Sequence, residues 1–173
     1  MYEIIKAYDQ QVPAARFIGL KYGEEDSVNG GFGAHWADWF EKERFQKLEE
    51  LTTEDFKNTY EDSFSYAGLI RCGYGGPLQY WIGMFLPDDT YVPEGYDYVD
   101  FPAARLGVSW IYGPEEEIFQ NDDKCLDRLR NEGYEIAEGK ELEGWFFERY
   151  VCPRFTTKDE KGNVILDICQ FIK

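Results

Sequence analysis

Histidine is nearly absent from this chain of 173 residues, because His35 is the only one. A single imidazole leaves little room for imidazole-based catalysis or for a histidine-rich metal site. The four cysteines, Cys72, Cys125, Cys152 and Cys169, form no C-x-x-C pair, and their spacing matches neither a zinc knuckle nor a thioredoxin-type motif. We expect free thiols that pack as small hydrophobic side chains, and we expect no metal and no other cofactor.

Positive charge is also scarce. The 18 lysines and arginines face 34 aspartates and glutamates, so the net charge is −16 and the sequence pI is near 4.4. A surface this acidic repels phosphate backbones, which argues against a direct nucleic-acid partner. The chain opens on Met1–Lys6 without a basic start or a long apolar run, and no later segment reaches ~18 apolar residues. We therefore expect a soluble, cytoplasmic protein with no membrane partner.

Apolar side chains, in contrast, are plentiful. Hydrophobic residues make up 43% of the chain and aromatic residues 18%, which is too much for a disordered acidic chain. A chain of this length folds as about one domain and buries roughly 70% of its extended surface. We expect a single domain over residues 1–173.

An internal repeat is the most informative feature. Pro13-Ala14-Ala15-Arg16 recurs as Pro102-Ala103-Ala104-Arg105, 89 positions later, and the same order of predicted elements follows each copy. The chain therefore looks duplicated, with one repeat over about 1–90 and the other over about 91–173.

The first repeat predicts strand, helix, strand, strand. A strand ends near Gly23, and an amphipathic helix spans about 34–51, with Trp36 and Phe40 assigned to the core. Thr52-Thr53-Glu54-Asp55 resembles a fresh N-cap and predicts a short extra helix. Strands then follow over roughly 64–72 and 78–86.

The second repeat predicts the same order. A strand over about 103–112 precedes a helix that starts at Gly113-Pro114, with three glutamates in its first turn, and stops at Gly133. Strands follow over about 144–152 and 164–171, while residues 87–100 read as a turn-rich linker. We predict an α+β fold of two tandem βαββ units around a pseudo-twofold axis, with helices outside and a ligand cleft between the halves.

Several motifs together resemble the GyrI-like small-molecule-binding family. They are the two Pro-Ala-Ala-Arg strands, Val92-Pro93-Glu94-Gly95-Tyr96, Tyr112-Gly113-Pro114 and Trp145-Phe146-Phe147-Glu148-Arg149-Tyr150. That family is related to the effector-binding domains of multidrug-responsive transcription activators. The resemblance implies a duplicated βαββ fold with a central cavity that takes bulky, often cationic, aromatic compounds. It also implies that a glutamate, here Glu148, lies at the bottom of that cavity.

Strand alternation supports a special position for Glu148. Phe146, Glu148 and Tyr150 share one face of their strand, and a carboxylate flanked by aromatic residues has a raised pKa when it is buried without a cation. Functional sites tolerate such arrangements. The alternatives are that Glu148 faces solvent or forms a buried ion pair with Arg16 or Arg105.

Other strand and helix aromatics can complete a cage around Glu148. The predicted ligand-binding residues are Trp39, Tyr66, Trp81, Trp110 and Phe146. For Trp39, Tyr66, Trp81 and Trp110, and also for Tyr112, ordinary packing in the core is an equally good interpretation.

Three classes of function fit these features. A transcriptional sensor needs a DNA-binding module, and the two repeats use the whole chain, so a regulator in cis is not expected. A binding protein would sequester toxic compounds or act on a protein partner, as the gyrase inhibitor of this family does. An enzyme would follow relatives that hydrolyse cyclopropanoid DNA-alkylating agents. In that case Glu148 would be the general base for water, and Tyr112 or Tyr150 would donate to the carbonyl that becomes a phenolate.

Overall fold

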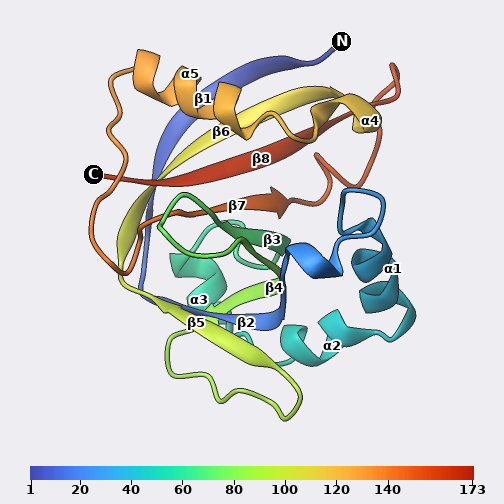
Figure 1. The fold of residues 1–173 in the computed structure, drawn as a ribbon, viewed down its shortest axis with the longest axis vertical. Coiled ribbons are helices and arrows are strands. Elements are labelled where there is room, and N and C mark those ends of the chain that lie inside the picture. Colours follow the sequence, from blue (N-terminus) through green and yellow to red (C-terminus); the bar gives the residue numbers. More distant parts are fainter.

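One eight-stranded antiparallel sheet forms the centre of the protein. The structure is a computed structural model that describes residues 1–173. The strands run in the spatial order β1-β6-β8-β7-β3-β4-β2-β5 (Figure 1). Their bounds are β1 Glu3–Val12, β2 Ala15–Tyr22, β3 Tyr66–Arg71, β4 Gln79–Pro87, β5 Asp97–Phe101, β6 Ala104–Pro114, β7 Trp145–Tyr150 and β8 Asn163–Ile172.

Two groups of helices accompany the sheet. The first half carries a short 3₁₀ turn, η1, followed by α1, α2 and α3, and the second half carries α4 and α5, which lie beside β6 and β1 in Figure 1. Their bounds are η1 Glu24–Asp26, α1 Gly33–Glu41, α2 Arg44–Glu49, α3 Glu54–Thr59, α4 Glu115–Ile118 and α5 Asp122–Asn131. No helix is long and apolar enough to cross a membrane.

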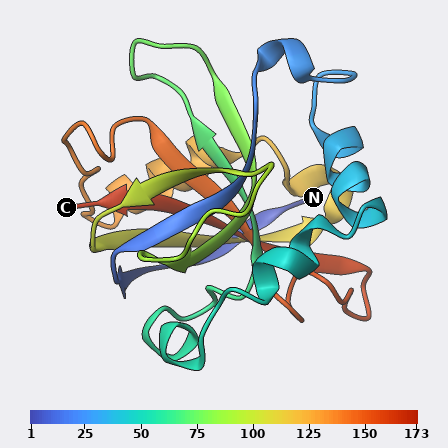
Figure 2. The same ribbon diagram turned by 90° about the horizontal axis from the view of Figure 1, so that it is seen from below.

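The strand order is symmetric about the central pair of β7 and β3. Exchanging β1–β4 with β5–β8 gives the same order read from the opposite edge of the sheet, so the predicted α+β fold with two related units is confirmed. The two units exchange their outermost strands, because β1 pairs with β6 and β5 pairs with β2. The sheet twists strongly from one edge to the other (Figure 2).

Each unit contains one strand more than the sequence predicted. Residues 3–12 received no strand assignment, and the predicted linker 87–100 contains most of β5. Both are edge strands with many exposed residues, so they lack the continuous apolar pattern of a buried strand such as β4. The units are therefore ββαββ.

Both predicted long helices are broken. The stretch 34–51 divides into α1 and α2 at Glu43, whose φ of 54° lies in the left-handed region. In the second half, α4 ends before Phe119, and Gln120 has a φ of 62°. The Asn121 side chain then donates to the carbonyl oxygens of Glu117 and Phe119, which fixes the turn into α5. Pro114 is the last residue of β6 and stands at the N-cap position of α4, without a side-chain capping bond.

The two faces of the sheet have different covers. On one face, Phe56 and Tyr60 from the α3 segment pack into a large core with Phe17, Leu69, Phe147 and other strand residues. The opposite face carries two separate hydrophobic clusters, one per half. The first-half cluster includes Trp39, Phe45, Leu48, Tyr80 and Ile82, and the second-half cluster includes Ile111, Ile118, Cys125, Leu166 and Ile168.

Candidate functional site

Glu148 lies on the central strand β7, between the first-half and second-half clusters. Its cross-strand partners are Gly68 on β3 and Ile168 on β8. Ile168 belongs to the second-half cluster, and Ile82, which pairs with Gly68, belongs to the first. A half-buried carboxyl group therefore lies where the apolar covers of the two halves meet.

A chain of polar contacts leads from α1 to this carboxyl group. The Trp36 indole N–H donates to the Tyr80 hydroxyl at 2.9 Å, and that hydroxyl donates to Glu148 Oε1 at 3.4 Å. Phe32, immediately before α1, stacks on the Tyr80 ring with 4.2 Å between the ring centroids and 3° between the planes. The start of α1 is thus attached to the sheet through Tyr80.

Tyr150 bounds the site on its other side. It lies two residues after Glu148 on the same face of β7, and its ring meets Trp36 at 4.8 Å and Phe155 at 4.8 Å, both edge to face. The aromatic rings around Glu148 therefore come from both halves and contact one another.

Burial dominates the electrostatics of the site. The pKa of Glu148 is raised to about 7, mainly by loss of water. Hydrogen bonds with Tyr150 and Tyr80 act in the opposite direction, and the charge of Asp122 adds to the increase. The same burial raises the pKa of the Tyr80 and Tyr150 hydroxyls above their usual value, so both remain protonated donors. The site holds a carboxyl group that titrates near neutrality beside two neutral phenols.

Two cavities lie away from Glu148. One, of about 370 Å³, is lined by Arg105, Glu132–Glu135 and Lys173, and another, of about 260 Å³, is lined by residues of the α3 segment together with Val151 and Cys152. Neither of these two cavities includes Glu148, beside which the Trp36, Tyr80 and Tyr150 side chains contact one another. No group of three or more His, Cys, Asp or Glu side chains is placed to hold a metal ion.

Three predicted site residues share the face of Glu148. Tyr150 borders it, whereas Phe146 is buried opposite Ile70 and Gln170. Tyr66 pairs with Tyr150 across the strands, but its ring stacks on Phe45 at 3.7 Å and its hydroxyl donates to Glu49. The helix α2 therefore covers Tyr66.

Four predicted site residues do not meet Glu148, and their assignment is corrected. Trp81, Trp110 and Tyr112 lie on the opposite face of the sheet, as the pairing registers show. Trp81 packs against Phe17, and the Tyr112 hydroxyl donates to Asp159 at 2.6 Å. Trp39 is on the correct face but has no exposed surface, and its indole donates to Tyr22.

Sequence reasoning missed Tyr80 and assigned Trp36 to the core. Trp36 is only half-buried and touches the site, and Phe40 is 57% exposed instead of buried. The spacing of Trp36 and Trp39 along α1 places both on one side of the helix. Their indole N–H groups need hydrogen-bond acceptors, which indicates that this side of the helix faces polar groups on the sheet. Tyr80 gave no comparable signal, because it is one of three aromatic residues in an apolar strand.

The alternative ion pairs for Glu148 are not formed. Arg16 binds Asp100, and Arg105 binds Asp9, so the repeated arginines each hold the edge strand that comes from the other half. Arg149, next to Glu148, points to the opposite face.

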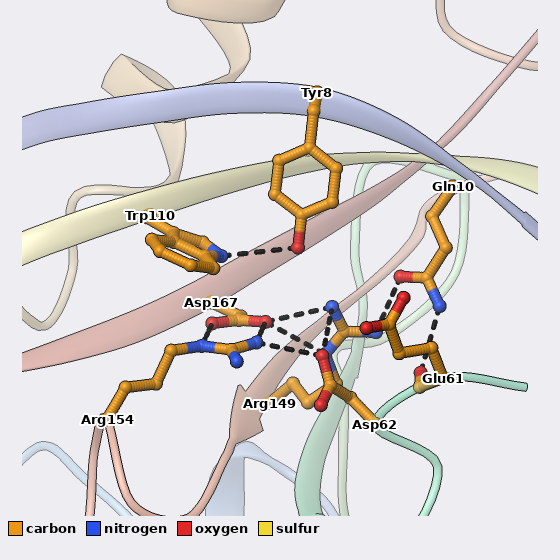
Figure 3. A network of polar contacts seen from close by, with 8 residues as sticks. All are labelled: Tyr8, Gln10, Glu61, Asp62, Trp110, Arg149, Arg154 and Asp167. Atoms are coloured by element: carbon orange, nitrogen blue, oxygen red, sulfur yellow. Dashed lines mark hydrogen bonds and ion pairs between the residues drawn. The ribbon is translucent and has the colours of Figure 1, made fainter. Parts of the chain in front are cut away.

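A buried polar network occupies that opposite face (Figure 3). Arg149 and Arg154 both bind Asp167, which has no exposed surface, and both approach Asp62. Arg149 also donates to Gln10 on β1. This network balances its own charges, so it leaves no free cation for Glu148.

Comparisons with known proteins agree on the fold. No family model and no curated protein matches the chain. Among solved structures, SAV2435 bound to tetraphenylphosphonium is 15% identical with a TM-score of 0.68, covering 98% of this chain and 94% of that one. The EcmrR C-terminal domain is 10% identical with a TM-score of 0.57 and 97% coverage of both chains. A hydrolase from Listeria innocua is 12% identical with a TM-score of 0.53, covering 97% of this chain and 92% of that one.

These likenesses bear on the fold alone, because the identities are low. The similarity extends over almost the whole length of each chain, including both halves of the sheet. The chain has the GyrI-like fold that its repeated motifs predicted.

Proposed function

We propose that this protein captures a bulky aromatic small molecule, preferably a cation, over Glu148. The observation that carries the proposal is a desolvated carboxyl group at the meeting of the two halves, bordered by aromatic rings and contacted by no basic side chain. A buried carboxylate without a cation is unfavourable, and a cationic ligand would relieve that cost. The tetraphenylphosphonium in the SAV2435 structure is a ligand of this chemistry.

The energetics allow such binding even though aromatic rings contact one another beside Glu148. Burying about 300 Å² of a planar ligand contributes roughly 7 kcal/mol, and association costs at least ~4 kcal/mol. A ligand that displaces Trp36 or Tyr150 replaces ring–ring contacts with ring–ligand contacts, so much of the lost packing is recovered. The cation–π term adds about 1–2 kcal/mol when the charge is desolvated.

Calorimetry with a matched pair of ligands tests the proposal. At pH 8, where Glu148 is ionised, we expect tetraphenylphosphonium to bind more tightly than the neutral triphenylphosphine oxide. The variant Glu148→Gln should lose the preference for the cation, whereas the exposed control Glu138→Gln should retain it. Equal affinity of both ligands for the parent protein would refute the cation preference, and no binding of either would refute the site.

A hydrolytic activity at the same site is the second candidate. The raised pKa of Glu148, about 7, suits a general base, and the Tyr150 hydroxyl is a neutral donor beside it. With a cyclopropane conjugated to a dienone, Glu148 would take a proton from water, and the water oxygen would bond to a cyclopropane carbon. The carbon–carbon bond would break, and its electron pair would make the dienone a phenolate, which then takes up the proton. One of the structures with the same fold is a hydrolase from Listeria innocua, which supports testing this reaction.

Mass spectrometry separates hydrolysis from capture. Incubation with a cyclopropanoid alkylator should give the water adduct faster than buffer alone, and Glu148→Gln should abolish the excess rate while it still binds the compound. A product rate equal to that of buffer would leave capture as the function and exclude hydrolysis of this class.

A further inference from the structure

The strand registers locate the pseudo-twofold axis at a single residue pair. Arg16 and Arg105 are the last residues of the two Pro-Ala-Ala-Arg copies, and they pair with Leu86 and Ile172. Leu86 on β4 therefore corresponds to Ile172 on β8.

The same correspondence identifies the equivalent residues on the central strands β3 and β7. Gly83 and Cys169 each lie three residues before those two positions, and they pair with Ala67 and Phe147. The residues that come next are Gly68 and Glu148, which are therefore equivalent in the two halves. They are also direct partners of each other, so the axis passes through this pair.

The position of the axis has a steric consequence. Direct cross-strand partners place their Cβ atoms about 5 Å apart on the same face, so any side chain at position 68 would enter the site of Glu148. A Cβ atom added at Gly68 would lie 2.8 Å from the Tyr80 hydroxyl and 3.0 Å from Glu148 Oε1. Two equal acids here would repel each other, and two large residues would fill the site.

The backbone does not require glycine at this position. Gly68 is not among the glycines with positive φ, and its neighbours Ala67 and Leu69 continue a regular strand. Glycine inside a strand costs about 0.5–1 kcal/mol relative to alanine. The space that the missing side chain leaves is therefore the feature that remains to be explained.

We propose that Gly68 is a positioning residue for the acidic site, because the space beside it lets the Glu148 carboxyl group reach the Tyr80 hydroxyl. This inference rests on the proposed function only for its effect on ligands. It makes the duplicated sheet asymmetric at its own axis, with an acid on one side and a residue without a side chain on the other, where the Tyr80 hydroxyl and the Glu148 carboxyl group meet.

The titratable groups that face Glu148 give the direction of the effect. They are Tyr80 from β4, Tyr150 from β7 and Asp122 from α5. The hydrogen bond with Tyr80 lowers the pKa of Glu148, so a methyl group that separates the two should raise it. The methyl group also removes water, which acts in the same direction.

NMR titration of the ligand-free protein tests this directly. We expect Gly68→Ala to raise the pKa of Glu148 by about 0.5–1 unit, since one charge-assisted hydrogen bond is lost. The control Gly107→Ala adds a methyl group to another strand glycine, where its nearest contacts are the apolar side chains of Leu129 and Ile172 at 3.0–3.1 Å. It should leave the pKa of Glu148 unchanged.

A double-mutant cycle separates positioning from general disturbance of the sheet. In the Tyr80→Phe background the hydrogen bond is already absent, so Gly68→Ala should shift the pKa by less than half of its effect in the parent protein. An unchanged pKa in Gly68→Ala, or an equal shift in both backgrounds, would overturn the inference. Because this measurement needs no ligand, its failure is distinct from a failure of the proposed capture function.

Binding gives the corresponding functional readout. At pH 7, a rise of about 0.5–1 unit in the pKa of Glu148 reduces its ionised fraction about 2–5-fold, so Gly68→Ala should weaken tetraphenylphosphonium binding about 2–5-fold relative to Gly107→Ala. The difference should shrink at pH 9, where both proteins carry an ionised Glu148. A loss that is independent of pH would show a steric block and would contradict the positioning role.

Discussion

Glu148 and Arg149 are neighbours with opposite energetic roles. The carboxyl group of Glu148 loses water without gaining a cation, while the guanidinium of Arg149 loses water within a network that contains two aspartates. The first arrangement lowers the stability of the ionised protein, and the second holds strands of both halves together. Strand alternation separates them, because adjacent residues point to opposite faces.

The first prediction concerns stability and pH at Glu148. Its pKa is raised in the folded protein from 4.5 to about 7, so the folded state binds the extra proton between these values and the free energy of unfolding falls as pH rises through this window. At 1.36 kcal/mol per unit, the loss above pH 7 amounts to about 3 kcal/mol. Urea denaturation should therefore find Glu148→Gln more stable than the parent at pH 8 and similar to it at pH 4. A variant that is less stable at pH 8 would contradict this.

The second prediction concerns Arg149. Replacement by methionine leaves Asp167 fully buried with only Arg154 as partner, and breaking a buried pair in this way costs about 3–5 kcal/mol. The matched change Arg105→Met removes a half-exposed pair with Asp9 and should cost less than about 1 kcal/mol. Similar losses in the two variants, measured by urea denaturation, would show that the network adds no more than a surface pair.

At the residue scale, alternation predicted which side chains share a strand face but not which faces belong together. Phe146, Glu148 and Tyr150 lie on one face as predicted. Trp110 and Tyr112 also share a face with each other, but the register between β6, β8 and β7 turns that face away from Glu148. A shift of one residue reverses the outcome, and nothing within a single strand specifies that register.

At the element scale, the sequence indicated the buried strands better than the helices and edge strands. The strand β4 is an almost continuous apolar run and was placed within one residue of its observed bounds. The breaks at Glu43 and Gln120 were missed, because a non-glycine residue with positive φ gives no composition signal. The edge strands were missed because their solvent-facing pattern resembles that of a loop.

The N-cap of α3 gives a prediction at this scale. The Thr53 side chain accepts a hydrogen bond from the Phe56 backbone N–H at 3.1 Å, as the sequence indicated, and Phe56 packs into the core beneath the sheet. Thr53→Ala should lower the free energy of unfolding by about 1 kcal/mol. Thr52→Ala, one residue earlier and outside the cap, should change it by a few tenths. Thermal or urea denaturation distinguishes them, and equal effects would mean that the cap does not hold α3.

At the scale of the whole molecule, the duplication joins the two halves instead of making two independent units. Each half lends its first strand to the other, and the repeated arginines fix these strands through Asp100 and Asp9. The repeat was visible in the sequence, but the exchange of strands was not, because it depends on pairing between residues far apart in the chain. The site of Glu148 lies on the axis that this exchange creates.

Separate expression of residues 1–90 and 91–173 tests the proposed division into two repeats. Alone, each fragment lacks the partner for its lent strand and exposes half of the central β3–β7 pair, so we expect neither to fold. Mixed in equal amounts, they should form a 1:1 complex whose circular dichroism matches that of the intact chain, since all strand pairs can then form. The intact chain with Arg16→Met and Arg105→Met serves as a control for these two ion pairs and should remain folded, because both pairs are only partly buried. A fragment that is folded and monomeric by itself would show that the halves are independent domains, contrary to the exchanged pairing.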